Sequence, residues 1–180
     1  MTAATAGTRR HGEQLLAFVN TLDVDHDTDA LDSAAALARW LREQGLLARR
    51  TPATEEDLAL ALRLRNGLRE VWAAHHDGRE AESADLDAAS SELPLRMSCC
   101  GPGPTLEPVD TGVRGALGRL LVAVNETVID GDWSRLKLCG DGTCRWAYYD
   151  ATKNRSKNWC GEGCSNRAKT RSYRERKRAQ

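Results

Sequence analysis

Apolar side chains recur at the spacing of an amphipathic α-helix in several stretches of the first 130 residues. Residues 54–76 show the clearest pattern, and the buried stripe of that helix would consist of Leu58, Leu62, Leu68 and Trp72. The same spacing predicts further helices over residues 11–21, 33–47 and 111–129, and a shorter one over residues 81–90. The N-terminal part is therefore expected to be mostly helical.

Helix boundaries carry signals of their own. Asp32 or Ser33 can cap the helix that follows, and Gly45 would end it. Thr54 and Asp57 have the spacing of a capping box, in which two side chains satisfy backbone N–H groups at the start of a helix. We expect the longest helix to begin there.

Two segments lack helical periodicity. Residues 93–110 have glycine and proline in the middle and short apolar runs on either side, which predicts a small β-hairpin or an irregular crossing loop. Cys99 and Cys100 in its turn are expected to be buried or half-buried small hydrophobes, with redox sensing as the alternative. The acidic run at residues 23–29 predicts a solvated loop, with a cation site at His26 as the alternative.

The zero net charge conceals two oppositely charged parts. Residues 131–180 contain 13 lysine or arginine residues and 5 acidic residues, a net charge of +8, whereas residues 1–130 carry −8. We therefore divide the chain into an acidic helical domain, residues 1–130, and a basic module, residues 131–180. A basic module of this kind suits a polyanionic partner.

The sequence shows no feature that predicts contact with a membrane. It contains no run of about 18 apolar residues, the length needed to span a bilayer. Residues 1–14 are polar and do not resemble a signal peptide. We expect a soluble cytoplasmic protein without a membrane partner.

Four cysteines in the basic module have the spacing of a metal site. Cys139, Cys144, Cys160 and Cys164 form the pattern C-x4-C, fifteen residues, C-x3-C. Two close pairs joined by a short loop can deliver four thiolates to one tetrahedral zinc ion. Glycines within both pairs would let the backbone curl around the metal. We expect one structural Zn²⁺.

Three other interpretations of the cysteines remain open. Disulfides would require an oxidising compartment, and the sequence shows no export signal. A catalytic zinc site would keep one position for water, whereas four cysteines close the coordination sphere. A redox pair or a catalytic thiol would not explain two paired turns.

The segment that follows the last cysteine predicts a basic helix. It lacks glycine and proline, and Arg167, Arg171, Arg174 and Arg178 would share one face. Two short strands, residues 136–139 and 144–149, would precede it. An α-helix with its side chains is about 10–12 Å wide and fits the major groove of DNA. The alternative is that the segment is a solvated tail. The expected DNA contacts are Asn166, Arg167, Lys169, Arg171, Arg174 and Arg178, with Lys153 and Arg155 from the preceding loop.

The C-terminal segment, CGDGTCRWAYYDATKNRSKNWCGEGCSNRAK, resembles the CGNR zinc finger of bacterial proteins. The four cysteines match its metal ligands, and Asn166 and Arg167 match the last two letters of its signature. The matching positions around them are Trp146, Tyr149, Asp150, Arg155 and Trp159. Ser165 stands where the family has glycine, so it would strain the turn if that position needs positive φ, or it could act as an N-cap for the helix.

The N-terminal part resembles the ABATE domain, on the segments FVNTLD, LARWLREQGLL and LRLRNGLREV. Together the two resemblances cover most of the chain. They imply a mostly helical domain followed by a zinc module, and a role as a stress-linked transcriptional regulator, with no established ligand.

These features favour a DNA-binding transcriptional regulator whose N-terminal domain senses a small-molecule effector or forms a homodimer. The alternative is an adaptor whose finger binds an acidic protein. No nucleophile motif or phosphate-binding loop is present, so we expect no enzymatic activity.

A ligand pocket between the N-terminal helices would be lined by Asn20, Trp40 and Trp72. The alternative is that the tryptophans are core residues and the asparagine caps a helix. His75 and His76 at a helix end are expected to be surface residues favoured by the helix dipole.

Overall fold

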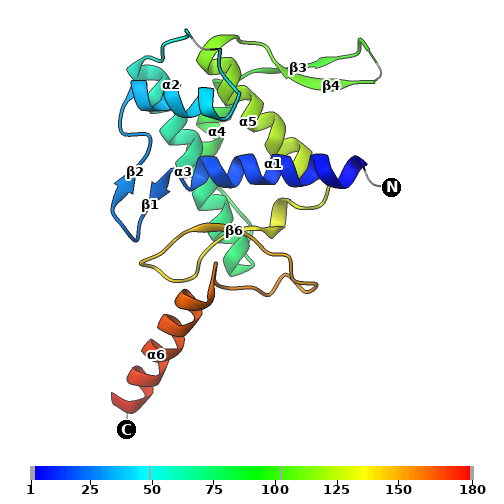
Figure 1. Cartoon of the computed structure of the whole chain (residues 1–180). Coiled ribbons are helices and arrows are strands. Elements are labelled where there is room, and N and C mark those ends of the chain that lie inside the picture. Colours follow the sequence, from blue (N-terminus) through cyan, green and yellow to red (C-terminus); the bar gives the residue numbers. More distant parts are fainter. Residues whose placement is uncertain (1–2, 49, 102, 179–180) are drawn as a thin grey trace.

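A computed structural model describes residues 3–48, 50–101 and 103–178. Helices form the body of the molecule, and the last helix extends away from it (Figure 1). The helices are α1 (Ala3–Val19), α2 (Ala34–Glu43), α3 (Glu55–Asp77), α4 (Ala84–Ser91), α5 (Gly112–Ile129), a 3₁₀ turn (Trp133–Arg135) and α6 (Glu162–Arg178). The strands pair as β1 (Leu22–Asp23) with β2 (Thr28–Asp29), β3 (Leu95–Ser98) with β4 (Thr105–Pro108), and β5 (Leu136–Leu138) with β6 (Ala147–Tyr149). The predicted mostly α fold is confirmed.

Helix α3 is the centre of the N-terminal domain, and α1, α2, α4 and α5 all pack against it. The predicted capping box is present, because Thr54 Oγ1 accepts from the N–H of Asp57 at 3.2 Å and the Asp57 carboxylate accepts from the N–H of Thr54 at 2.9 Å. In the predicted stripe, Leu68 and Trp72 are fully buried, whereas Leu62 is only partly buried. The periodicity therefore identified the buried face of α3 correctly, except that Leu62 lies at its edge and is partly exposed.

Helix α2 begins as expected. The side chain of Ser33 caps it by accepting from the N–H of Ala36 at 3.2 Å. The helix ends at Glu43, and Gly45 adopts a left-handed conformation with φ +69° just beyond it. Glycine pays little for that conformation, which explains why the helix stops there.

Helices α3 and α4 approach each other unusually closely at Gly67. A Cβ atom built on Gly67 would lie 2.4 Å from the backbone nitrogen of Leu86. Glycine thus allows the two backbones to touch, and α4 lies directly on the side of α3.

The N-terminal boundary predictions were partly wrong. Helix α1 begins at Ala3 rather than at residue 11. In the acidic run, residues 24–27 form an exposed turn, as expected of a solvated loop, and the residues on either side pair as the short β1–β2 hairpin. Within it, the carboxylate of Asp23 binds the Nδ1 atom of His26 at 2.9 Å. This pair is exposed to solvent, and it stabilises the β1–β2 turn.

The predicted hairpin at residues 93–110 is confirmed as β3–β4, with Leu95 opposite Pro108 and Ser98 opposite Thr105. Cys99 and Cys100 lie in its turn and are exposed. The expectation that they are buried small hydrophobes was wrong, because the hairpin extends from the body (Figure 1).

The hydrophobic core crosses the boundary predicted at residue 130. Leu136, Leu138 and Ala147 from β5 and β6 are buried in the same cluster as Leu64 and Leu68 of α3. By contrast, Val128 near the end of α5 is 52% exposed. The sheet of the basic module is therefore packed onto the helical domain rather than tethered to it.

Candidate metal centre and nucleic-acid interface

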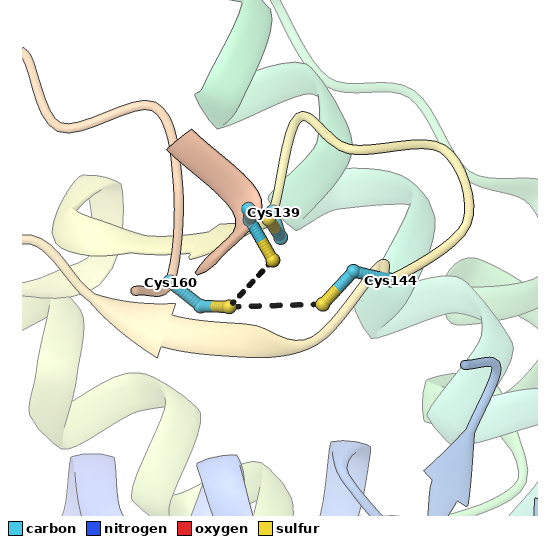
Figure 2. Close-up of side chains that lie close together, drawn as sticks. Cys139, Cys144 and Cys160 are labelled. Carbon is cyan, nitrogen blue, oxygen red and sulfur yellow. Dashed lines mark hydrogen bonds between the residues drawn. The ribbon is translucent and has the colours of Figure 1, made fainter. Parts of the chain in front are cut away.

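Four cysteine side chains meet where the β5–β6 hairpin adjoins the start of α6. Cys139 follows β5, Cys144 precedes β6, Cys160 precedes α6 and Cys164 lies in its first turn. The four sulfur atoms lie within 4.8 Å of one another. Figure 2 shows Cys139, Cys144 and Cys160 directed toward a common point. We call these four residues the cysteine cluster.

The sulfur spacing of the cysteine cluster fits zinc. Zn–S bonds of about 2.3 Å in a tetrahedron place the sulfur atoms about 3.8 Å apart. The Sγ–Sγ distances are 3.6 Å between Cys144 and Cys160 and 3.7 Å between Cys160 and Cys164. Disulfide bonds, at about 2.0 Å, are therefore not formed. Three of the cysteines are buried and one is half-buried, as in a closed structural site.

Asp141 organises the turn between Cys139 and Cys144. Its side chain accepts from the N–H of Thr143 at 3.2 Å, and its carbonyl accepts from the N–H groups of Cys144 and Arg145, both at 3.0 Å. These bonds curl the backbone so that both cysteines of the pair face the same side. Asp141 is only 2% exposed, so its carboxylate belongs to the interior of the module.

In this turn a glycine is required because there is no room for a side chain, and not because of an unusual φ angle. Gly140 has no room for a side chain, because a Cβ atom there would lie 2.6 Å from the ring of His76. A Cβ on Gly142 would meet open space, and neither glycine adopts positive φ. We expected the conformational freedom of both glycines to let the backbone curl around the metal, and this expectation was wrong, because neither of them adopts a conformation that only glycine favours.

The protein environment affects the thiols unequally. Burial raises the pKa of Cys144 to about 11, and burial likewise raises the pKa of Cys160. Burial acts on Cys139 too, but hydrogen bonds from the backbone N–H groups of Cys160 and Asp141 outweigh it and lower its pKa. Since zinc binds thiolates, metal binding here must displace protons and depends on pH.

Arg167 joins the basic helix to the cysteine cluster. Its Nε donates to Oδ2 of Asp141 at 2.7 Å, and its guanidinium lies 3.1 Å from Sγ of Cys164. Burial would raise the pKa of Asp141, but the hydrogen bond from Arg167 lowers it to about 2. The guanidinium also lies 3.4 Å from Asp25 in the β1–β2 turn. A buried carboxylate and a metal-ligating sulfur thus share one arginine.

The remaining basic residues of α6 are exposed. A shallow groove along one side of the helix is lined by Asn166, Arg167, Arg171, Arg174 and Arg178, among others. The predicted shared face is thus present, and Lys169 lies outside this groove. Arg171 reaches back to Asp141 at 3.4 Å. Arg167 and Arg171 therefore face the module, whereas the arginines further along α6 face solvent.

Two family models match the chain. Residues 12–130 match ABATE, described as "Putative stress-induced transcription regulator". The chain belongs to the ABATE family. Residues 135–177 match the CGNR zinc finger, and its four clustered cysteines hold one structural zinc ion. A search of curated proteins finds no match.

Ser165 of the CGNR finger lies inside α6, one residue after Cys164. Its N–H donates to the carbonyl of Gly161 at 3.3 Å, and it is not among the described residues with positive φ. The turn therefore imposes no strain on a serine at this position. Nor does Ser165 cap the helix, since α6 begins at Glu162.

The residues predicted to line an ABATE pocket have other contacts. Asn20 binds β6 of the finger, donating to the carbonyl of Ala147 at 3.0 Å and accepting from its N–H at 2.7 Å. The ring of Trp40 packs at a tilt of 47° against Phe18, with the ring centroids 5.4 Å apart, and Trp72 is fully buried in the core. Asn20 therefore joins the two modules, and both tryptophans are core residues, which was the alternative to the pocket.

His75 and His76 lie against the finger and are half-buried rather than exposed. Nδ1 of His75 is 3.0 Å from the carbonyl of Leu136, and its ring packs edge-on to Trp133. Burial lowers the pKa of both histidines. The expectation of charged residues stabilised by the helix dipole was therefore wrong.

The finger contains a buried ion pair between Lys137 and Asp150 that the sequence did not predict. Nζ of Lys137 lies 2.9 Å from the carboxylate of Asp150, and their side chains are 5% and 0% exposed. The carboxylate also accepts from the N–H groups of Thr152 and Lys157, both at 3.0 Å. The only sequence signal was the position of Asp150 in the resemblance to the CGNR pattern. This network fixes the loop that carries Lys153 and Arg155.

None of the helices in the described ranges is both long and apolar enough to cross a membrane.

Proposed function

We propose that this ABATE-family chain acts in the cytoplasm as a DNA-binding transcriptional regulator, in which zinc fixes α6 for docking to duplex DNA. The supporting observation is the placement of α6. Its first two turns hold Cys164 and Arg167, and its distal part extends from the body (Figure 1). The basic side chains of this distal part are exposed.

The charges of α6 have two roles. Arg167 and Arg171 bind Asp141, so they fix the helix to the finger. Within the described part of the chain, Arg174 and Arg178 form no ion pair, and they line the same groove as Asn166. These three residues are the best placed to meet DNA. Lys169 lies outside the groove and suits a phosphate on a neighbouring strand.

The dimensions suit the major groove. A helix of 17 residues is about 25 Å long and, with side chains, about 10–12 Å wide. Arginine can bind guanine edges as well as phosphates. Lys153 and Arg155 would extend the contact to the backbone; Arg155 also donates to the hydroxyl of Ser134 at 2.6 Å, which orients it. The N-terminal domain would sense an effector or form a homodimer.

Salt-titrated binding to duplex DNA tests this function. Zinc-loaded protein should bind with an affinity that falls steeply as salt rises, because phosphate contacts release counterions. Replacing both Arg174 and Arg178 with alanine should reduce the slope of log K against log salt by about 2, roughly one per lost phosphate contact. The matched control replaces Arg79 and Arg96, two exposed arginines of the ABATE domain, and should leave the slope unchanged.

Absence of binding at low salt would contradict the proposal. If the protein then captured an acidic protein in the presence of nuclease, the adaptor alternative would replace it.

A further inference from the structure

A cleft of about 520 Å³ lies between the ABATE domain and the zinc finger, at some distance along the chain from the residues of α6. Arg69, Glu70 and Ser83 line it from the helical side, and Leu138 and Arg145 line it from the finger. Its volume is within the range of about 300–1,000 Å³ found for small-molecule sites. A ligand bound there would touch both modules.

Arg69 is a buried cation without an acidic partner. It is 9% exposed and donates to two carbonyls, those of Val19 at 3.2 Å and Arg145 at 3.0 Å. No ion pair to Arg69 occurs in the ranges that the structure describes. By contrast Arg65, one turn earlier, binds Asp29 with two nitrogens at 2.6 and 2.7 Å. Buried charges are ordinarily paired, so the environment of Arg69 is incomplete.

The pKa of Arg69 also indicates that its positive charge is poorly compensated. Burial, together with the nearby positive charges of Arg65 and Arg145, lowers the pKa of Arg69 to about 10. An anion placed beside these guanidinium groups would relieve that repulsion, and its bonds to them would be charge-assisted.

Arg145 supplies a second cation from the finger side. Its backbone has a φ of +51°, a left-handed conformation that is unfavourable for a residue with a Cβ. In this conformation its carbonyl meets Arg69 while its half-buried side chain lines the same cleft. No carboxylate within the described residues forms an ion pair with it. The strained residue therefore places a second guanidinium beside the first.

The rest of the lining limits the kind of ligand. The first turn of α4, at Ser83 and Ala84, contributes the positive end of a helix dipole. Glu70 and Glu82 also line the cleft, and Glu70 accepts from the hydroxyl of Ser83 at 2.6 Å. These carboxylates disfavour a ligand with several acidic groups, and they can accept hydrogen bonds from a ligand. A small molecule with one acidic group and several donor groups is the best match.

We propose that this cleft binds a small organic anion, whose carboxylate or phosphate group contacts Arg69 and Arg145 and whose hydroxyl or amino groups face Glu70 and Glu82. Because one arginine belongs to the ABATE domain and the other to the finger, the bound anion joins the two modules. The site is separate from the residues first expected to form a pocket, Asn20, Trp40 and Trp72.

Isothermal titration calorimetry of the zinc-loaded protein tests the proposal without DNA. The probes are lactate, glycerol 3-phosphate and inorganic phosphate, each at constant ionic strength against chloride. The background variant lacks Arg174 and Arg178, so that α6 does not contribute a phosphate site. We expect saturable binding of lactate or glycerol 3-phosphate, and the probe that binds more tightly distinguishes a carboxylate from a phosphate ligand.

Arg145→Asn is the diagnostic variant, because asparagine tolerates the left-handed conformation of this position while the guanidinium and its charge are removed. It should weaken binding by about tenfold or more. Arg63→Asn is the control on α3, since Arg63 binds Glu92 outside the cleft, and it should bind as the background does. Failure of all three probes to bind, or equal affinity in Arg145→Asn, overturns the proposal. Neither result bears on DNA binding by α6.

Discussion

Nε of Arg167 donates to the buried carboxylate of Asp141 at 2.7 Å. Asp141 shapes the turn that carries Cys139 and Cys144, whereas Arg167 belongs to the helix that carries Cys164. This hydrogen bond therefore joins the two halves of the metal centre independently of the metal. It also means that an arginine of the CGNR signature has a structural role at the base of the basic helix.

Arg167→Gln should loosen α6 even with zinc bound, because it leaves Asp141 without its strongest partner. We expect several-fold faster amide hydrogen exchange in the first two turns of α6, with the zinc content unchanged. Arg174→Gln removes the same charge further along the helix and should not change exchange. Equal exchange in the wild type and Arg167→Gln would contradict this role.

Asp150→Asn should destabilise the finger strongly. The substitution leaves Lys137 buried without a counter-charge, and breaking one partner of a buried ion pair costs about 3–5 kcal/mol. Urea unfolding at pH 7 measures the loss. The control is Asp87→Asn, at an exposed position of α4, which should change stability by less than about 0.5 kcal/mol. A similar small change in Asp150→Asn would show that the pair contributes no net stability.

Gly67→Ala tests the close contact between α3 and α4. Alanine favours a helix by about 1 kcal/mol, but here its methyl group would lie 2.4 Å from the backbone of Leu86. Separating two backbones should outweigh that gain and leave a net loss of about 1–3 kcal/mol. Gly12→Ala in α1 has only an ordinary contact at 3.9 Å with Leu136, and should stabilise the protein. Thermal unfolding of the two variants should therefore shift in opposite directions.

His75 should make stability depend on pH in the weakly acidic range. Burial lowers its pKa below the ordinary value of 6.5, so the unfolded chain binds a proton before the folded protein does. The stabilising effect is complete above pH 6.5 and is lost as pH falls below it. His75→Gln should flatten the dependence of the melting temperature on pH between 7 and 5. An unchanged slope would show that His75 is not responsible.

Local patterns in the sequence predicted much of this structure. The capping box at Thr54, the glycine stop at Gly45 and the paired cysteines depend on residues close together in the chain, and all three are present. The β3–β4 hairpin followed from its central glycine and proline residues. These features need no knowledge of tertiary contacts.

The parts that sequence reasoning missed depend on distant residues. Asn20 binds Ala147, which is 127 residues away, so nothing near Asn20 indicates its partner. Arg167 resembled the other basic residues of α6 because the acidic residue that it binds lies 26 positions earlier. The core also continues into β5 and β6, although the change of charge at residue 130 suggested separate modules.

The zinc content of the purified, reduced protein tests the central claim most directly, namely that four cysteines hold one ion and thereby fix the basic helix. Elemental analysis should find one zinc per chain, and Cys160→Ser should reduce it well below one. Protein that contains no metal, while α6 keeps the hydrogen-exchange protection of the folded state, would contradict the account.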